Sequence, residues 1–462
     1  MKKYFIFLLL LFYISSSAEE LTLNSLEMQE LARNFRLEVQ RFPGVIRAPL
    51  PNDYLQHLGM LLARHRTDLN IHYAFFIINS PEINAFAGPG GTIAINSALI
   101  LTTTKESELA AVLAHEIAHS DQKHWLKDLN RQQNMKIPMI ASMLAAAALT
   151  VLNPAIGGGA MVGGMTRFQQ NEINYTRSHE KEADRIGIQL LYEADFNPQG
   201  MVDFFKKMYE QERYRYMGDI PAMLLTHPVN EERIADAENR IAALPKKHYI
   251  NNSDYFFFKE MVRVLSTNKP AQLAHDYYQK KLKEEPGSAT LRYGYALALM
   301  KSLKFSEAKP VLETLNQQSP HNLYYLLALS GCELGLKNTS HALSIMEKLY
   351  TDYPDSLPVI LDYSNALIQF NHYQKAQLVI EEGLEEYPNN IPLLQNLAQA
   401  QSRNHQMARA YLTRAKILMQ TGTPREAMMA LRNARASSKD ALLDAQIDAQ
   451  IKMLEDTMKN AS

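Results

Sequence analysis

A strict period in the second half of the chain constrains its fold more than any other feature. Four prolines recur at one constant spacing: Pro286, Pro320, Pro354 and Pro388. Five alanines keep the same spacing, each preceding its proline by the same interval where a proline follows: Ala274, Ala308, Ala342, Ala376 and Ala410. A proline stops a helix, and a small residue lets two helices approach closely. Each period therefore predicts a pair of packed helices, and successive pairs stack into a solenoid.

This period, with a small residue in the second helix and a proline after it, resembles the tetratricopeptide repeat. The usual Trp, Gly and Tyr positions of its first helix are mostly missing, so the repeats are degenerate. Residues 423–434 look like one more second helix, followed by a capping helix. We predict an all-α solenoid over residues 270–462, with the only cysteine, Cys332, in its helical core. A solenoid of this type is a binding scaffold; the alternative is that it only packs against the first half.

The chain begins with a pattern typical of exported proteins. Lys2 and Lys3 precede an apolar stretch at 4–14 and small residues at 16–18. We predict a signal peptide over residues 1–18, cleaved after Ala18, because the apolar stretch is too short to span a membrane comfortably. An exported chain with a single cysteine cannot form an internal disulfide, which fits the periplasm of a bacterium. A net charge of −1 gives no hint of nucleic-acid binding.

The first half, residues 19–250, has mixed periodicity and is expected to join the solenoid through a linker at 251–269. The expected elements are helices at 25–39 and 51–66, strands at 71–79 and 90–100, and a largely apolar helix that begins near Glu106. Gly90 and Gly91 are expected to form the turn into the second strand. If the edge of that strand is free, it could bind an extended peptide by adding a strand. The fold class is α+β and mostly helical, with a small sheet.

The segment "LAHEIAHSDQKHW" (113–125) carries two histidines four residues apart on this helix. His115 and His119 lie about 40° apart around the helix axis, so both rings can reach one metal ion. Glu116 is rotated by about 100° from His115, where it could hold a water beside the metal without binding the metal. The flanking residues are small or apolar, so the histidines are buried and need partners. His124 and Trp125, further along, are expected to serve structure and packing.

A catalytic zinc needs a third protein ligand and an open position for water. The segment "SHEKEADRIGIQLL" (178–191) offers Glu180, on a stripe of small residues that lets another helix approach. Asp184, one turn along the same stripe, is placed to accept a hydrogen bond from a histidine and fix its tautomer. Glu182 lies on a charged stripe that belongs in water. His179 points off the ligand stripe and is expected to be a bystander.

"HEIAH" (115–119), followed further along the chain by "EKEAD" (180–184), resembles the gluzincin family of Oma-type and CAAX-prenyl-type metalloproteases. The resemblance implies a zincin-like domain that holds one Zn²⁺ per chain through His115, His119 and Glu180, with Glu116 as general base. The order of signal peptide, catalytic domain and repeats is similar to that of family members in Gram-negative periplasms. It implies misassembled or stalled outer-membrane proteins as substrates, and contact of the repeats with the machinery that assembles their barrels.

The segment "THPVNEERI" (226–234) also matches an element of this family. Pro228 suits the first position of a helix, which would place His227 at the helix mouth. Three hypotheses for His227 stay open. It is a helix-entry residue without chemistry, or it stabilises the oxyanion together with Arg233, or it fills the fourth zinc position and keeps the enzyme latent.

Residues 137–166 contain no charged side chain. Pro154 and the glycines at 157–159 interrupt the segment, and its apolar half is shorter than the roughly 20 residues of a membrane helix. A buried helix pair, a lid over the zinc and a peripheral contact with a membrane are the alternatives. The whole chain is predicted to be a zinc endopeptidase that acts on unfolded or misassembled proteins. The competing hypothesis is a repeat-based chaperone or scaffold with a structural or latent zinc site.

Overall fold

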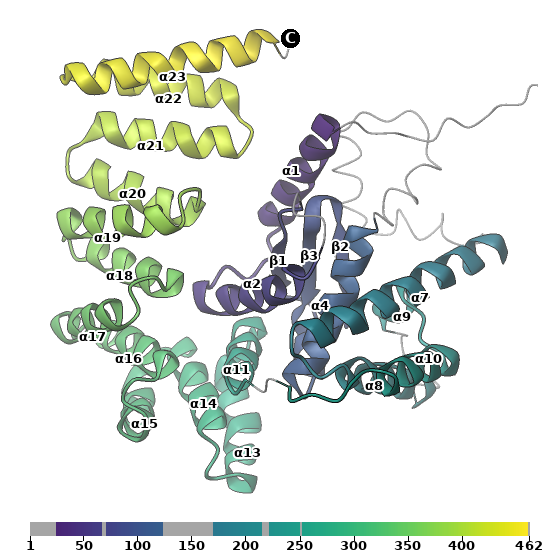
Figure 1. Ribbon diagram of the computed structural model, residues 1–462. Helices are drawn as coiled ribbons and strands as arrows, with labels where there is room; N and C mark the ends of the chain where they lie inside the picture. The colour runs from purple at the N-terminus through teal and green to yellow at the C-terminus, as the bar shows by residue number, and fades with distance from the viewer. Residues whose placement is uncertain (1–24, 67–70, 123–169, 215–220, 250–251, 461–462) are drawn as a thin grey trace, which may run out of the picture.

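The computed structural model describes residues 25–66, 71–122, 170–214, 221–249 and 252–460. A first part built around a small sheet is followed by a curved stack of helices that lies beside it (Figure 1). The predicted signal peptide, His124, Trp125 and the uncharged insert at 137–166 lie outside the described residues. Among the helices that are described, none combines the length and the apolar character needed to cross a membrane.

A three-stranded sheet with the order β1–β3–β2 lies in the first part. β3 (Thr92–Asn96) pairs in parallel with β1 (Ala74–Ile78) and antiparallel with β2 (Ala85–Gly88). All five residues of β3 are buried. Gly90 and Gly91 form the short helix η1 (Pro89–Gly91) before β3, with φ of 67° and 75°, conformations that favour glycine.

Two predictions about the second strand are wrong. It ends at Asn96, and the next residues form helix α3 (Ser97–Thr102). It also offers no free edge for an extended peptide, because β2 covers one side and β1 the other. β2 has only four residues, too few for a period of two to stand out in the sequence.

Helix α4 (Glu106–Asp121) is the centre of the first part. Every residue from Leu109 to Ala118 is buried, as its apolar sequence predicts. It packs against β2 and three helices: α2 (Pro49–Ala63), α7 (Gln170–Glu193) and α8 (Gln199–Tyr214). The other helices of this part are α1 (Ser25–Arg41), α9 (Ala222–Thr226) and α10 (Glu231–Ala242). A metal-binding motif on α4 is therefore held by the core itself.

The predicted linker contains a packed helix, α11 (Asp254–Ser266). Its buried residues include Tyr255 and Phe258, which are fully buried, and it packs against α2, α3 and α14 of the stack. The Tyr255 hydroxyl lies 2.7 Å from Thr103 Oγ1, just before α4, and the Lys259 ammonium donates to the Thr103 carbonyl. The two parts of the molecule are thus joined by a buried helix.

The second part is the predicted solenoid of helix pairs. After α12 (Pro270–Gln272), η2 (Leu273–Tyr278) and α13 (Gln279–Glu284) come α14 (Ala289–Lys301), α15 (Phe305–Gln318), α16 (Leu323–Gly335), α17 (Thr339–Asp352), α18 (Leu357–Gln369), α19 (Tyr373–Glu386), α20 (Ile391–Arg403), α21 (Met407–Gln420), α22 (Pro424–Ser437) and α23 (Ala441–Asn460). α13, α15, α17 and α19 each end two residues before a periodic proline. Cys332 is fully buried in α16.

The last helices differ from the prediction in one respect. α22 follows the second helix α21 directly, so it stands in the position of a first helix rather than of another second helix. The turns inside the pairs are regular, and the residue with positive φ recurs with the same period at Leu303, Lys337, Asn371 and His405.

The solenoid contacts the first part at its first helices and again further along the stack (Figure 1). Besides α11, helix α18 also packs against α2. At the turn between α21 and α22, a Cβ placed on Gly422 would lie 3.4 Å from Cζ of Arg33 in α1. The stack therefore curves back so that the turn at Gly422 reaches α1.

Candidate metal centre

Four side chains from three segments converge beside the middle of α4. His115 and His119 come from α4, Glu180 from α7, and His227 follows the short helix α9. One ligand atom from each lies within 4.8 Å of all the others. Gly187 lets α7 approach α4 closely here, because a Cβ at this position would lie 3.3 Å from the backbone nitrogen of His115.

The separations of these atoms fit a tetrahedral zinc ion. His115 Nε2 lies 3.0 Å from His119 Nε2 and 3.4 Å from Glu180 Oε2. His227 Nδ1 lies 2.9 Å from Glu180 Oε1 and 3.4 Å from His115 Nε2. Tetrahedral zinc with ligands at about 2.0–2.1 Å holds its ligand atoms roughly 3.3–3.4 Å apart. Three imidazoles and one carboxylate are also the donor types that zinc prefers.

Asp184 and Arg233 contact the side chains of this cluster and each other. Asp184 Oδ1 lies 3.0 Å from His115 Nδ1, the position from which a carboxylate directs Nε2 toward a metal. Arg233 donates to both Asp184 oxygens, from Nε at 2.8 Å and from Nη2 at 2.7 Å. Its Nη1 lies 3.0 Å from Glu180 Oε2 and donates to the Pro228 carbonyl at 2.6 Å. Asp184 is thus where we expected it, next to a histidine ring nitrogen.

Arg233 differs from its prediction. We expected its guanidinium to face a reaction intermediate, but all three nitrogens are engaged with carboxylates and a carbonyl. The side chain is 5% exposed and stacks over Phe205, with 4.7 Å between Cζ and the ring centroid. In this geometry Arg233 holds Asp184 and Glu180 and has no nitrogen left free.

The charges of the cluster depend on one another. Burial would lower the pKa of His115, but hydrogen bonds to Asp184 and Glu180 outweigh burial and raise this pKa to about 10. Burial would raise the pKa of Asp184, yet Arg233 and His115 keep it below its ordinary value. The pKa of Glu180 lies well below its ordinary value, because the histidines outweigh its burial. The two carboxylates therefore stay ionised and favour a positive charge between them.

Glu116 is placed differently from the other acidic groups. Its side chain is 1% exposed, and neither carboxylate oxygen has a hydrogen-bond partner among the described residues. His227 Nε2 lies beyond hydrogen-bond distance, 3.8 Å from Glu116 Oε1. A buried carboxylate with free acceptor oxygens beside a cluster of metal-binding donors fits a group that holds a reacting water.

His227 reaches the cluster by a different route from the predicted one. Pro228 does not begin a helix; α10 starts at Glu231, and its cap is Asn230, whose side chain accepts from the Arg233 backbone N–H at 2.9 Å. His227 instead caps the C-terminus of α9. Asparagine is favoured as an N-cap and proline at the first helical position, so the sequence allowed a helix start at either place.

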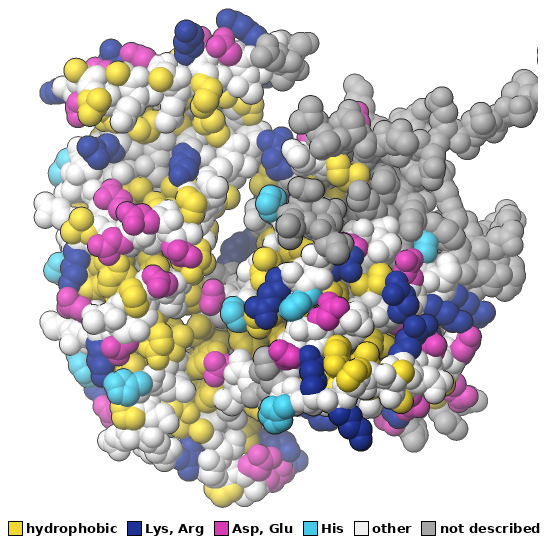
Figure 2. Space-filling view, in the orientation of Figure 1, with side chains coloured by type: hydrophobic (Ala, Val, Ile, Leu, Met, Phe, Trp, Pro, Cys, Tyr) yellow, Lys and Arg dark blue, Asp and Glu magenta, His cyan; other side chains and the backbone are white. Residues whose placement is uncertain are grey.

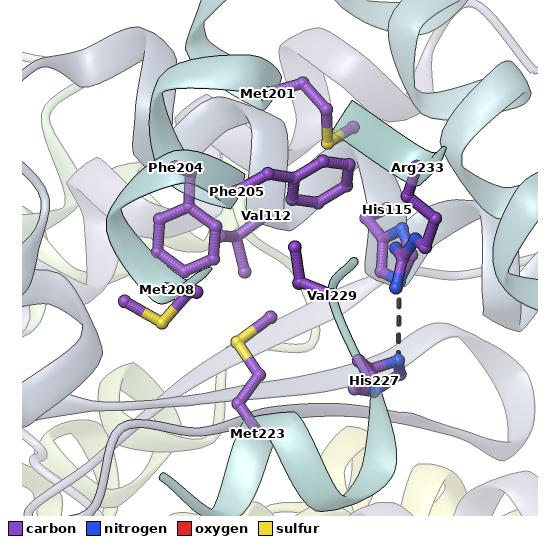
Figure 3. Close-up of a pocket in the computed structure, with 10 residues that line it drawn as sticks. All are labelled: Val112, His115, Met201, Phe204, Phe205, Met208, Met223, His227, Val229 and Arg233. Carbon is purple, nitrogen blue, oxygen red and sulfur yellow. Dashed lines mark hydrogen bonds between the residues drawn. The ribbon is translucent and has the colours of Figure 1, made fainter. Parts of the chain in front are cut away.

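An apolar pocket adjoins the histidines. Figure 3 shows His115 and His227 joined by a hydrogen bond at one side of it, with Arg233 nearby. The other lining residues are apolar: Val112, Met201, Phe204, Phe205, Met208, Met223 and Val229. Met223 belongs to α9, and the His227 backbone N–H donates to its carbonyl at 2.6 Å. His227 and one wall of the pocket are therefore parts of the same short helical segment.

The other residues discussed from sequence lie away from the cluster. Glu182 is partly exposed on α7, on the charged stripe, while Glu180, Ala183, Asp184 and Gly187 are all buried against α4. His179 is 8% exposed and belongs to no metal-binding group among the described residues.

Comparison with known proteins gives two family matches. Residues 49–241 match peptidase family M48, and residues 333–401 match the tetratricopeptide repeat. The chain is 34% identical over 301 residues to the beta-barrel assembly-enhancing protease of Escherichia coli (strain K12), and 33% identical over 297 residues to that of Yersinia pestis. These alignments cover 65% and 64% of this chain and 61% of each relative. The chain is also 31% identical over 184 residues to the mitochondrial metalloendopeptidase OMA1 of Saccharomyces cerevisiae, which covers 39% of this chain and 49% of the relative. The chain thus spans less than two thirds of the length of the relatives it matches, and the matches confirm the predicted resemblance.

Proposed function

We propose that this chain, whose residues 49–241 form a domain of peptidase family M48, is a zinc-dependent endopeptidase of unfolded or misassembled proteins. The observation that carries the proposal is the convergence of His115, His119 and Glu180 beside Glu116. Three ligands from the packed helices α4 and α7 leave one position, beside His227, for the chemistry, as in catalytic zinc sites. The free oxygens of Glu116 favour a catalytic site, because a structural site with four protein ligands would leave this buried carboxylate without a role.

The protein's own residues divide the work in this proposal. His115, His119 and Glu180 would hold the zinc, which supplies a Lewis acid that polarises the attacking water and the scissile carbonyl. Glu116 takes a proton from the water and returns it to the leaving amine. Asp184 fixes the tautomer of His115, and Arg233 holds Asp184 and Glu180 in place.

His227 is proposed to close the site in its resting state. Its Nδ1 lies within hydrogen-bond distance of Glu180 and close to His115, where a fourth ligand would stand. A protease among unfolded precursors needs restraint, and occupation of the fourth position by imidazole would exclude water. Because Met223 lines the adjoining pocket from the same helix, movement of α9 would open both the fourth position and one wall of the pocket.

We also propose the place and partners of the enzyme. Two relatives are named beta-barrel assembly-enhancing protease, which supports outer-membrane proteins as substrates and the barrel assembly machinery as a partner of the repeats. The pattern of residues 1–18 supports export to the periplasm. The competing function, a chaperone or scaffold with a latent zinc site, is favoured by the presence of His227 as a fourth donor.

Glu116→Gln tests the protease proposal against the scaffold. The variant should keep its zinc, since its three ligands remain, and should lose cleavage of casein by about 10²- to 10⁴-fold, the usual share of a general base. Glu182→Gln is the matched control, with the same chemical change on the partly exposed stripe of α7, and should retain the wild-type rate. Cleavage by Glu116→Gln at the wild-type rate would disprove the catalytic role. Suppression of substrate aggregation by Glu116→Gln would show that any binding activity is separate.

A further inference from the structure

Successive first helices of the solenoid contact one another unevenly along the stack. α20 packs against both helices of the preceding pair, α18 and α19. α22 stands in the corresponding position for the next pair, but it packs along α21 and, like α18 with α16, has little or no contact with the preceding first helix, α20. A groove of about 470 Å³ lies open between α20 and α21. In a regular solenoid the next first helix would fill this groove.

The groove is polar at positions where the preceding pair is apolar. Three of its lining residues follow buried apolar residues by one period: Gln395 follows Leu361, Ser402 follows Ile368, and Arg414 follows Ile380. The three apolar residues are at most 6% exposed, whereas their polar counterparts are all exposed. Covering these polar groups with another apolar helix would leave them without partners, at a cost in free energy. The groove is therefore unsuited to a helix of the kind that fills the others.

Positive charge surrounds the groove. Residues 389–437 contain one acidic residue, Glu426, and seven exposed basic residues: Arg403, Arg409, Arg414, Lys416, Arg425, Arg432 and Arg435. Of these seven basic residues, Arg435 alone forms ion pairs with other described residues, and its partners are Asp444 and Asp448. The neighbouring helix α19 carries four glutamates at 381–386. Figure 2 shows this contrast, with dark blue side chains at the level of α21 and magenta ones below.

We propose that the groove between α20 and α21 binds an acidic amphipathic helix of a partner protein. Arg414 would pair with its carboxylates, and the exposed basic residues around the groove would attract it. Met407, Ile417 and Leu418 also line the groove and would contact its apolar side chains. A helix fits this groove because the corresponding groove between α18 and α19 holds a helix, α20. The proposal rests on the protein-binding role of the repeats proposed above and is independent of the metal centre.

Fluorescence anisotropy of the full-length chain tests this inference. The probe is a labelled peptide with Glu and Leu at helical spacing, and its control has Lys in place of Glu. The Glu peptide should bind, more weakly at high salt, and Arg414→Glu should weaken binding by at least about tenfold. Arg409→Glu is the matched control, because it makes the same change of charge on the same helix outside the groove lining, and it should change binding by less than about twofold. Arg414→Gln, which removes the charge without reversing it, should give an intermediate loss.

Several results would overturn the inference. If Arg414→Glu and Arg409→Glu weaken binding of the Glu peptide equally, the peptide is attracted by the general positive charge and not bound in the groove. If the Lys peptide binds as tightly as the Glu peptide, charge does not determine binding. No binding of the Glu peptide would also overturn it. A dimer in sedimentation that Arg414→Glu dissociates would assign the groove to a second copy of the chain. Casein cleavage by Arg414→Glu, measured in parallel, should equal the wild-type rate, so failure here is distinguishable from failure of the protease proposal.

Discussion

Replacing Arg233 with Met tests whether the buried charges behind the metal centre stabilise the first part of the molecule. Arg233 binds Asp184 through two nitrogens and lies 3.0 Å from Glu180 through the third. The three residues are between 2% and 5% exposed. Methionine replaces the apolar stem of arginine but carries no charge, so the variant leaves two buried carboxylates without their guanidinium.

The expected loss is large. Removing one partner of a buried ion pair costs about 3–5 kcal/mol, because the other charge stays buried. With a urea dependence of about 2 kcal/mol per M, the urea midpoint of this part should fall by roughly 1.5–2.5 M. Bound zinc would supply another positive charge beside Glu180. The loss should therefore be larger in protein treated with a chelator than in protein loaded with zinc.

Urea unfolding followed by circular dichroism compares the variant with a matched control. Arg240→Met is the matched control on the same helix, because Arg240 is 40% exposed and pairs with Asp236 at 2.8 Å; this variant should lose less than about 1 kcal/mol. Arg233→Lys keeps the charge without the bidentate geometry and should fall between the two. Equal midpoints for Arg233→Met and Arg240→Met would refute the role assigned to Arg233.

Three further predictions concern the metal centre and the solenoid. His227→Ala should cleave casein faster than the wild type if His227 closes the site; a loss of about 10²- to 10³-fold would instead indicate an oxyanion donor, and no change would leave His227 without a chemical role. Glu180→Ala should lower zinc occupancy sharply and Glu182→Ala should not, as metal analysis of both purified proteins can check; equal occupancy would contradict the choice of ligand. Leu303→Asn should raise the free energy of unfolding by about 1 kcal/mol, because Leu303 has a φ of 61° and is 78% exposed. Leu303→Ala keeps a residue that disfavours this backbone conformation, so thermal unfolding should show no increase in its stability.

The sequence was most informative where a period repeats. His115, His119, Glu180 and Asp184 could be singled out because residues three or four apart share a face of a helix. The structure brings those faces together. The repeated prolines likewise marked the ends of second helices to within two residues.

Contacts between distant segments could not be derived in this way. Arg233 and Asp184 are 49 residues apart, and neither carries a local signal of the pairing. The strand β2 is too short to show a period, so the central place of β3 was missed. The open groove beside α20 also depends on how α22 packs, which the spacing of small residues does not encode.

The return of the solenoid to the first helix has a consequence for how this protein can evolve. Most stacked repeats tolerate the gain or loss of a unit, because each unit contacts only its neighbours. Here α11, α18 and the turn at Gly422 all touch the first part. Duplication of a single repeat between α11 and α21 would displace the turn at Gly422 from Arg33, and the contact between this turn and α1 would be lost. The copy number should therefore be held constant in this stretch, and new units should be tolerated only beyond α22.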